Sequence, residues 1–187
     1  MSKEIKYITI GRPASDDAVR NLPKSEQTPD RIMNIVGPHK EICEMVNPVS
    51  LNKALCPEDA GEDSTVPEIT LPDVEKFIKG SDFVLIVTSI GFAQEYKIAI
   101  EVVKLVKEKM IPFHILLARQ FDFASIEDVV KENDAKIEAI TDQITKTNIY
   151  HDAFDNFPPD MPTKEAFRQI SEELYSIMQD IIKKHAV

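Results

Sequence analysis

The sequence has no long apolar run, few cysteines and fewer basic than acidic residues, and each absence excludes a class of protein. No apolar stretch approaches the length of about 18 residues that a membrane-spanning helix requires. The two cysteines, Cys43 and Cys56, form no CxxC pair and have no histidine at zinc-binding spacing, so we expect incidental thiols and no metal site. The first residues, MSKEIKYITIG, lack the layout of a signal peptide, and cytoplasmic is the expected location.

Lysine and arginine total 22 against 32 aspartates and glutamates, which gives a formal net charge of −10. Binding to nucleic acid or to anionic lipid requires clustered basic side chains, so we expect neither kind of partner. Apolar residues make up 43% of the chain and charged residues 29%, which is typical of a soluble globular protein. We predict one domain over residues 1–187.

Short apolar runs of strand length alternate with segments that repeat apolar residues at helical spacing. Strands are expected over Glu4–Ile10, over Arg31–Val36, from Phe83, over Phe113–Ala118 and over Thr145–Tyr150. Helices are expected around Ala18–Leu22, over His39–Val46, from Pro72 to Gly80, over about Ala93–Met110, over Ile126–Ile140 and over 163–185. Residues Pro57–Pro67 read as a mobile loop. The alternation predicts an α/β three-layer sandwich with a mostly parallel, Rossmann-like central sheet.

The segment Asp82–Ser125 reads as a strand, a crossover helix and a parallel strand, a unit that places ligand sites at the carboxyl ends of its strands. The turn after its first strand is where a glycine-rich, phosphate-binding loop would lie. It carries Ile90, Phe92, Gln94 and Glu95 in place of glycines. The pattern therefore predicts the scaffold of a nucleotide-binding protein without the glycine-rich turn that would bind phosphate.

Five segments occur in an order and spacing that resemble one known family. They are IKYITIG with ASDDAVRNL, FIKGSDFVLIVTSIGF, IPFHILLARQFDF with its Phe-x-Phe pair (Phe121 and Phe123), TNIYHDAF, and TKEAFRQISEELYSIMQDII. Together they resemble the amino-terminal GTPase domain of the FtsZ/tubulin superfamily, on the FtsZ side, over nearly the whole chain. The resemblance implies that domain's fold and a nucleotide crevice at the strand ends.

The chain departs from the family pattern at both phosphate-binding turns. The first loop keeps Gly11, but Arg12 and Pro13 follow it, and two aspartates come shortly afterwards. The GGGTGTG turn of the family keeps only Gly91, and Lys97 takes the place of its last glycine. Proline donates no N–H group, and bulky or acidic side chains oppose the approach of a phosphate.

The positions that would recognise guanosine differ as well. The resemblance places Asp17 at the asparagine of the first helix, His151 in the Pro-Asn-Asp turn and Ser171 at the aspartate of the core helix. Ala124 replaces the glutamate that contacts the ribose, whereas Phe167, which would stack on the base, remains. The family's hydrolytic loop and second domain would follow the core helix, and we expect both to be absent from this chain.

These observations leave three functional hypotheses. The first is a non-catalytic FtsZ/tubulin-like domain that acts through protein association, with a second copy (a homodimer) or with an intact FtsZ-like paralogue. The second is a small-molecule or altered-nucleotide binding protein or enzyme, and the third is a GTP-binding cytoskeletal protein. We predict no catalytic residue and no cofactor, and expect neither GTP nor GDP to bind. The residues predicted to line the crevice are Gly11, Arg12, Gly91, Gln94, Lys97, His151 and Phe167.

Simpler alternatives exist for several of these residues. Arg12 and Lys97 can form surface ion pairs with neighbouring carboxylates instead of binding an anion. His151 beside Asp152 can be structural. The apolar stripe of the last helix can be fully buried on the sheet instead of binding a partner.

Overall fold

The computed structural model of the 187-residue chain describes residues 3–10, 22–23, 26–28, 30–35, 71–89, 95–119, 127–142, 147–151 and 160–185. The helices predicted around Val19 and over His39–Val46, and the loop predicted over Pro57–Pro67, lie outside these residues.

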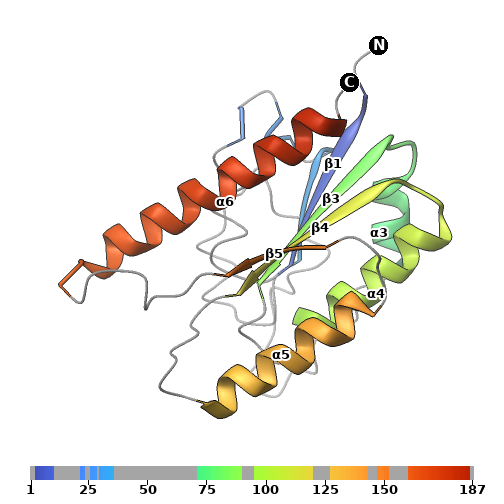
Figure 1. Ribbon diagram of the computed structural model, residues 1–187. Helices are drawn as coiled ribbons and strands as arrows, with labels where there is room; N and C mark the ends of the chain where they lie inside the picture. The colour runs from blue at the N-terminus through green and yellow to red at the C-terminus, as the bar shows by residue number, and fades with distance from the viewer. Residues whose placement is uncertain are drawn as a thin grey trace, which may run out of the picture.

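Five parallel strands form one sheet, with helices on both of its faces (Figure 1). The elements are β1 (Ile5–Ile10), β2 (Ile32–Ile35), α3 (Leu71–Ile78), β3 (Phe83–Ser89), α4 (Glu95–Glu108), β4 (Phe113–Arg119), α5 (Glu127–Thr141), β5 (Thr147–His151) and α6 (Thr163–His185). The strand order is β2-β1-β3-β4-β5, and every pairing is parallel. The predicted α/β sandwich with a Rossmann-like parallel sheet is confirmed.

Alternate residues of each strand point to opposite faces and build two separate cores. Helices α3, α4 and α5 cover the face that carries Ile8, Ile86 and Ile115. Helix α6 packs on the opposite face, which carries Tyr7 and Leu85. Because both faces are covered, the central strands are nearly continuous apolar runs, as parallel sheets require.

Both ends of helix α3 carry residues that favour the start or the end of a helix. Pro72 and Asp73 stand in its first turn, and Gly80 follows its end with a φ of 81°, a conformation that favours glycine. Lys6, although only 8% exposed, donates from its Nζ atom to the carbonyl oxygens of Phe77 (2.5 Å) and Lys79 (3.4 Å). A lysine of β1 thus satisfies carbonyl groups at the end of α3 and joins the helix to the sheet.

Helix α6 crosses its face of the sheet on a narrow apolar stripe. Leu174, Met178 and Ile181 are buried, whereas Glu172, Glu173, Ser176 and Asp180 are exposed. At its carboxyl end the His185 ring stacks on Phe83, with 4.2 Å between the centroids. Helix α6 therefore ends over the amino ends of the strands and begins near their carboxyl ends (Figure 1). Among the described residues, no helix has both the length and the apolarity to cross a bilayer.

Candidate functional site

The strand order places a topological switch point between β1 and β3. The chain leaves β1 toward β2 on one side, whereas β3, β4 and β5 extend the sheet on the other. Ligands of open parallel sheets bind where the carboxyl ends of two such strands diverge. The register pairs Ile10 of β1 with Thr88 of β3, so these two strands end side by side. The chain therefore leaves β1 and β3 at neighbouring points of this edge.

Buried polar groups lie directly beneath this edge of the sheet. Thr9, Asn34 and Thr88, each within two residues of its strand's end, are between 0% and 3% exposed. The hydroxyl group of Thr9 donates to Oδ1 of Asn34 on the neighbouring strand. Such groups are costly to bury unless they are hydrogen-bonded, so this pair fixes the ends of β1 and β2 relative to each other.

Of the predicted site residues, Gly11, Arg12, Gly91 and Gln94 lie outside the described residues. Lys97 is described, and it is an exposed side chain of the first turn of α4. Its Nζ atom lies 6.0 Å from the centroid of the Tyr96 ring, at the outer limit of a cation–π contact. Lys97 thus lies in the first turn of the helix that follows β3.

His151 and Phe167 are placed by their backbone positions. His151 is the last residue of β5 and pairs with Arg119 of β4, which confirms its predicted place at a strand end. Because β5 is two strands from β3, His151 stands about 10 Å from the switch point. Phe167 lies near the beginning of α6, on the face of the sheet opposite α4. The fold thus brings Lys97, His151 and the start of α6 to the same end of the molecule.

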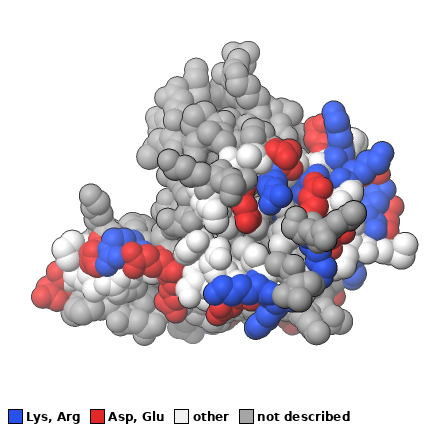
Figure 2. Space-filling view, turned by 90° about the horizontal axis from the view of Figure 1, so that it is seen from above, with Lys and Arg blue, Asp and Glu red and all other residues white. Residues whose placement is uncertain are grey.

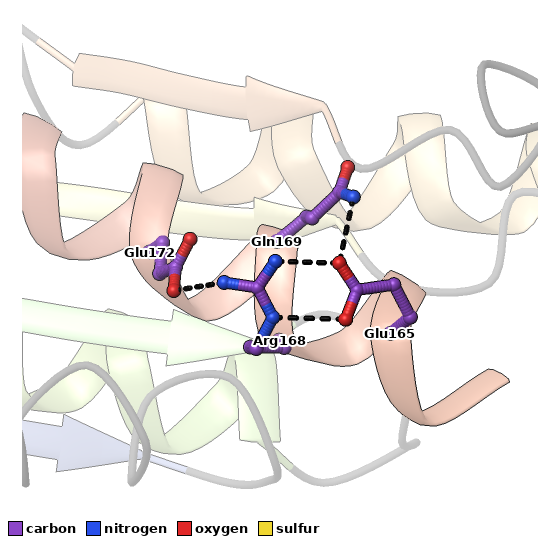
Figure 3. A network of polar contacts seen from close by, with 4 residues as sticks. All are labelled: Glu165, Arg168, Gln169 and Glu172. Atoms are coloured by element: carbon purple, nitrogen blue, oxygen red, sulfur yellow. Dashed lines mark hydrogen bonds and ion pairs between the residues drawn. The ribbon is translucent and has the colours of Figure 1, made fainter. Parts of the chain in front are cut away.

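A polar network on the first turns of α6 was not predicted (Figure 3). Arg168 donates from Nε to Glu165 Oε2 at 2.9 Å and from its Nη atoms to Glu165 and Glu172, and Gln169 donates to Glu165 at 3.1 Å. These hydrogen bonds lower the pKa of the Glu165 carboxyl to about 2 and raise the pKa of Arg168. Arg168 is therefore matched by two carboxylates and does not supply a free charge for an anion. The acid–base spacing of three and four residues is the signal that could have revealed this network.

A pocket of about 560 Å³ lies at the opposite edge of the sheet, away from the switch point. It is formed between α3, the turn before β3 and the turn before β4. Its lining residues are Pro72, Glu75, Lys76, Ile78, Lys79, Gly80, Ser81, Lys109 and Ile111. Nothing in the sequence pattern pointed to this pocket, because α3 and the end of α4 are separated by about one crossover unit of the chain.

The whole described architecture matches solved structures of one superfamily. FtsZ from M. jannaschii matches with a TM-score of 0.74 and 14% sequence identity, over 100% of this chain and 56% of the FtsZ chain. The chain has the FtsZ/tubulin GTPase-domain fold. CetZ from Methanosaeta thermophila matches with a TM-score of 0.68 at 12% identity, over 97% of this chain and 54% of CetZ. The phage tubulin PhuZ, solved with GDP, matches with a TM-score of 0.58 at 12% identity, over 95% of this chain and 55% of PhuZ.

The predicted resemblance to the FtsZ/tubulin superfamily is thus confirmed at the level of the fold. No protein-family model and no curated protein sequence matches the chain. The chain spans little more than half the length of the FtsZ, CetZ and PhuZ chains that it matches. What the FtsZ/tubulin-like fold does in this protein therefore has to be argued from its own residues.

Proposed function

We propose that this chain is a non-catalytic FtsZ/tubulin-like domain that acts through protein association and neither binds nor hydrolyses GTP. The observation that supports the proposal most is the register between β1 and β3, which ends both strands side by side. In such a sheet the two turns that follow these strands are the ones that would contact a bound nucleotide. Their residue types therefore decide whether phosphate can bind.

Those turns carry residues that oppose a triphosphate. Backbone N–H groups must approach the phosphate oxygens closely, which is why glycines line such turns in nucleotide-binding proteins. Pro13 offers no N–H group, and Phe92 occupies the glycine-rich signature with a bulky ring. Asp16 and Glu95 add negative charge to the same two turns and repel a polyanion.

Two cations near this edge, Arg168 and Lys97, do not compensate for that repulsion. Arg168 at the start of α6 is bound by Glu165 and Glu172. Lys97 is an exposed side chain of α4, where solvent and salt screen its charge. A screened lysine does not replace a loop of converging amides.

Protein association is the role that we favour over small-molecule binding for this fold. One matched structure is described as an FtsZ dimer, so association between copies has a precedent within the same fold. Partners of this chain would be a second copy or an FtsZ-like protein with an intact nucleotide site. The net charge of −10 keeps the domain soluble and disfavours polyanionic partners.

Titration calorimetry with GTP and GDP, each in the presence of magnesium, tests the nucleotide half of the proposal. We expect no heat of binding at millimolar nucleotide, and a dissociation constant in the micromolar range would refute it. ATP serves as the matched control for non-specific anion effects.

Sedimentation velocity over a wide range of protein concentration tests association between copies. A shift to faster-sedimenting species with concentration is expected for a dimer, and a single monomeric species throughout would leave only a foreign partner. A thermal-shift panel of nucleotides and metabolites separates the competing hypothesis of a small-molecule binder. Stabilisation by one compound that is lost in His151→Ala and Lys97→Ala would contradict the association role.

A further inference from the structure

Methionine 110 occupies a backbone conformation that normally belongs to glycine. Its φ is 55°, in the left-handed region. The N–H group of Met110 donates to the carbonyl of Lys107 (2.9 Å), and the N–H group of Ile111 donates to the carbonyl of Val106 (3.3 Å). This pair of hydrogen bonds is the Schellman motif, whose left-handed position is usually glycine or asparagine.

The neighbouring helix shows the usual choice. Helix α3 ends with Gly80 in the left-handed region, at a φ of 81°. A side chain with a Cβ atom makes this conformation less favourable, so methionine destabilises the end of α4 relative to glycine. A conformational cost that the sequence retains at one exposed position is a reason to ask what the side chain does there.

The Met110 side chain is also the most exposed apolar group described. It is 88% exposed, and Leu71, at 37%, is the other large apolar side chain that stands out from the described surface. Both are chain neighbours of residues that line the pocket between α3 and α4: Leu71 precedes Pro72, and Met110 lies between Lys109 and Ile111. Within the described part of the chain, the two large exposed apolar side chains thus both belong to residues next to this pocket's lining.

The pocket itself combines an apolar floor with a basic rim. Ile78 is 1% exposed and Ile111 is partly buried, and both pack in the core beneath the pocket. Lys76, Lys79 and Lys109 stand against a single lining carboxylate, Glu75. Lys109 is paired with that carboxylate, which ties the end of α4 to α3.

Two of the pocket's lysines are available to pair with an acidic partner. Lys76 and Lys79 are exposed, and within the described part of the chain neither ammonium group takes part in an ion pair. Figure 2 looks at the end of the molecule where the termini lie and shows lysine and arginine side chains gathered on the side of α3 and α4, with acidic residues among them. The basic rim is therefore local, within a chain whose net charge is −10.

We infer that this pocket is a docking site for a short acidic segment of a partner protein, which places an apolar side chain on the partly buried Ile111 beside Met110. Charge complementarity with Lys76 and Lys79 selects the acidic segment. Methionine is flexible and polarisable, which suits it to cover an apolar side chain of varying shape. An extended polyanionic surface, such as a membrane, would also meet the acidic remainder of the chain, whereas a short segment interacts mainly within the screening length of about 8 Å.

This inference specifies where the association under the proposed function takes place and rests on that proposal. Its test uses no nucleotide, so failure of the docking site and failure of the nucleotide argument are separate results. A weak, specific peptide interaction of this kind fits recognition by a groove with apolar and charged subsites.

The experiment measures fluorescence anisotropy of short labelled peptides with the full chain at physiological ionic strength. The probes are a peptide of glutamates with two central leucines, the same peptide with serines for the leucines, and its lysine counterpart. We expect only the first peptide to bind. Met110→Gly, and separately Lys76→Glu with Lys79→Glu, are expected to weaken binding about tenfold or more, which corresponds to about 1.4 kcal/mol.

Two measurements keep the result independent of folding. Met110→Gly is expected to melt at the same or a higher temperature than the natural chain, because glycine relieves the left-handed strain. Lys104→Glu, on α4 and in a pair with Glu101 away from the pocket, is the matched charge control and should bind normally. Equal binding of the serine peptide, no loss of binding in Met110→Gly, no peptide binding at millimolar concentration, or tighter Met110-dependent binding to phosphatidylserine vesicles would each overturn the inference.

Discussion

The hydrogen bond between Tyr7 and Glu26 offers a quantitative test of how the fold is held together. The Tyr7 ring is 0% exposed in the core under α6, and its hydroxyl donates to Glu26 Oε2 at 2.5 Å. Tyr7→Phe keeps the ring and removes this bond. A hydrogen bond to a charged group contributes about 1.5–3 kcal/mol, and we expect the lower end because water can reach the 29%-exposed Glu26 side chain.

The same variant has a defined pH dependence. Burial, together with the hydrogen bond to Glu26, raises the pKa of Tyr7 in the folded chain above its ordinary value of 10.0. The unfolded chain therefore loses this proton first. As pH rises above about 10, the natural chain loses stability by about 1.4 kcal/mol per pH unit, whereas Tyr7→Phe has no hydroxyl to ionise.

Urea unfolding, followed by circular dichroism, measures both effects. At neutral pH the variant should be about 1.5 kcal/mol less stable, equivalent to a fall of roughly 3–6 °C in Tm for a chain of this size. By pH 11 the natural chain should have lost about 1.4 kcal/mol of stability, so the difference between it and the variant should nearly vanish. Tyr96→Phe, whose ring also packs against the core, is the control and should show neither effect. A variant as stable as the natural chain at neutral pH, or a difference that stays constant up to pH 11, would refute the reasoning.

Three further substitutions test the packing and the polar contacts. Leu174→Ala should lower the free energy of unfolding in urea by about 3 kcal/mol, because it leaves a cavity beneath α6. A decrease well below that expected for a core leucine would mean that α6 is not packed as described. Lys6→Met keeps the buried stem but removes its hydrogen bonds to the end of α3. It should lower the free energy of unfolding by about 1–2 kcal/mol and speed amide exchange at the end of that helix. Unchanged exchange would contradict this role. Arg168→Ala should not change the melting temperature measurably because the network is exposed, but the carboxyl pKa of Glu165, followed by NMR, should rise from about 2 toward its ordinary value. A Glu165 pKa that stays low in that variant would show another cause.

The strands and long helices were predictable because their patterns are strong. Phe83–Ser89 and Phe113–Arg119 are apolar runs of strand length, and the stripe of α6 repeats at helical spacing over its full length. The order in which the strands pair was implied by the family resemblance and not by the residue pattern, because it depends on contacts between segments that are far apart in the sequence. That order is what sets β1 beside β3 and creates the switch point.

The end of α4 shows where a sequence pattern is insufficient. A helix to about Met110 was predicted, but it ends at Glu108 because Met110 adopts a left-handed conformation. No glycine or asparagine marks the turn, so the helical spacing continues past the residue at which the helix stops. The exposure of Met110 and the adjoining pocket therefore could not be predicted from the sequence.

The sequence predicted where on the sheet the candidate site lies, but not the polar contacts around it. The strand-end rule correctly places His151 at the carboxyl end of β5. The network around Arg168 was missed because the stripe of α6 was read for its apolar residues only. The contact between Tyr7 and Glu26 joins a strand to a loop 19 residues away, which no local pattern indicates.

The proposed function depends most on the proposal that no nucleotide binds at the edge shared by β1 and β3. A crystal of the chain soaked with GTP and magnesium at millimolar concentration tests this directly. We predict no nucleotide density at the ends of these two strands. Clear density for a guanosine nucleotide, enclosed by the turns that begin at Gly11 and Ile90, would contradict the central claim.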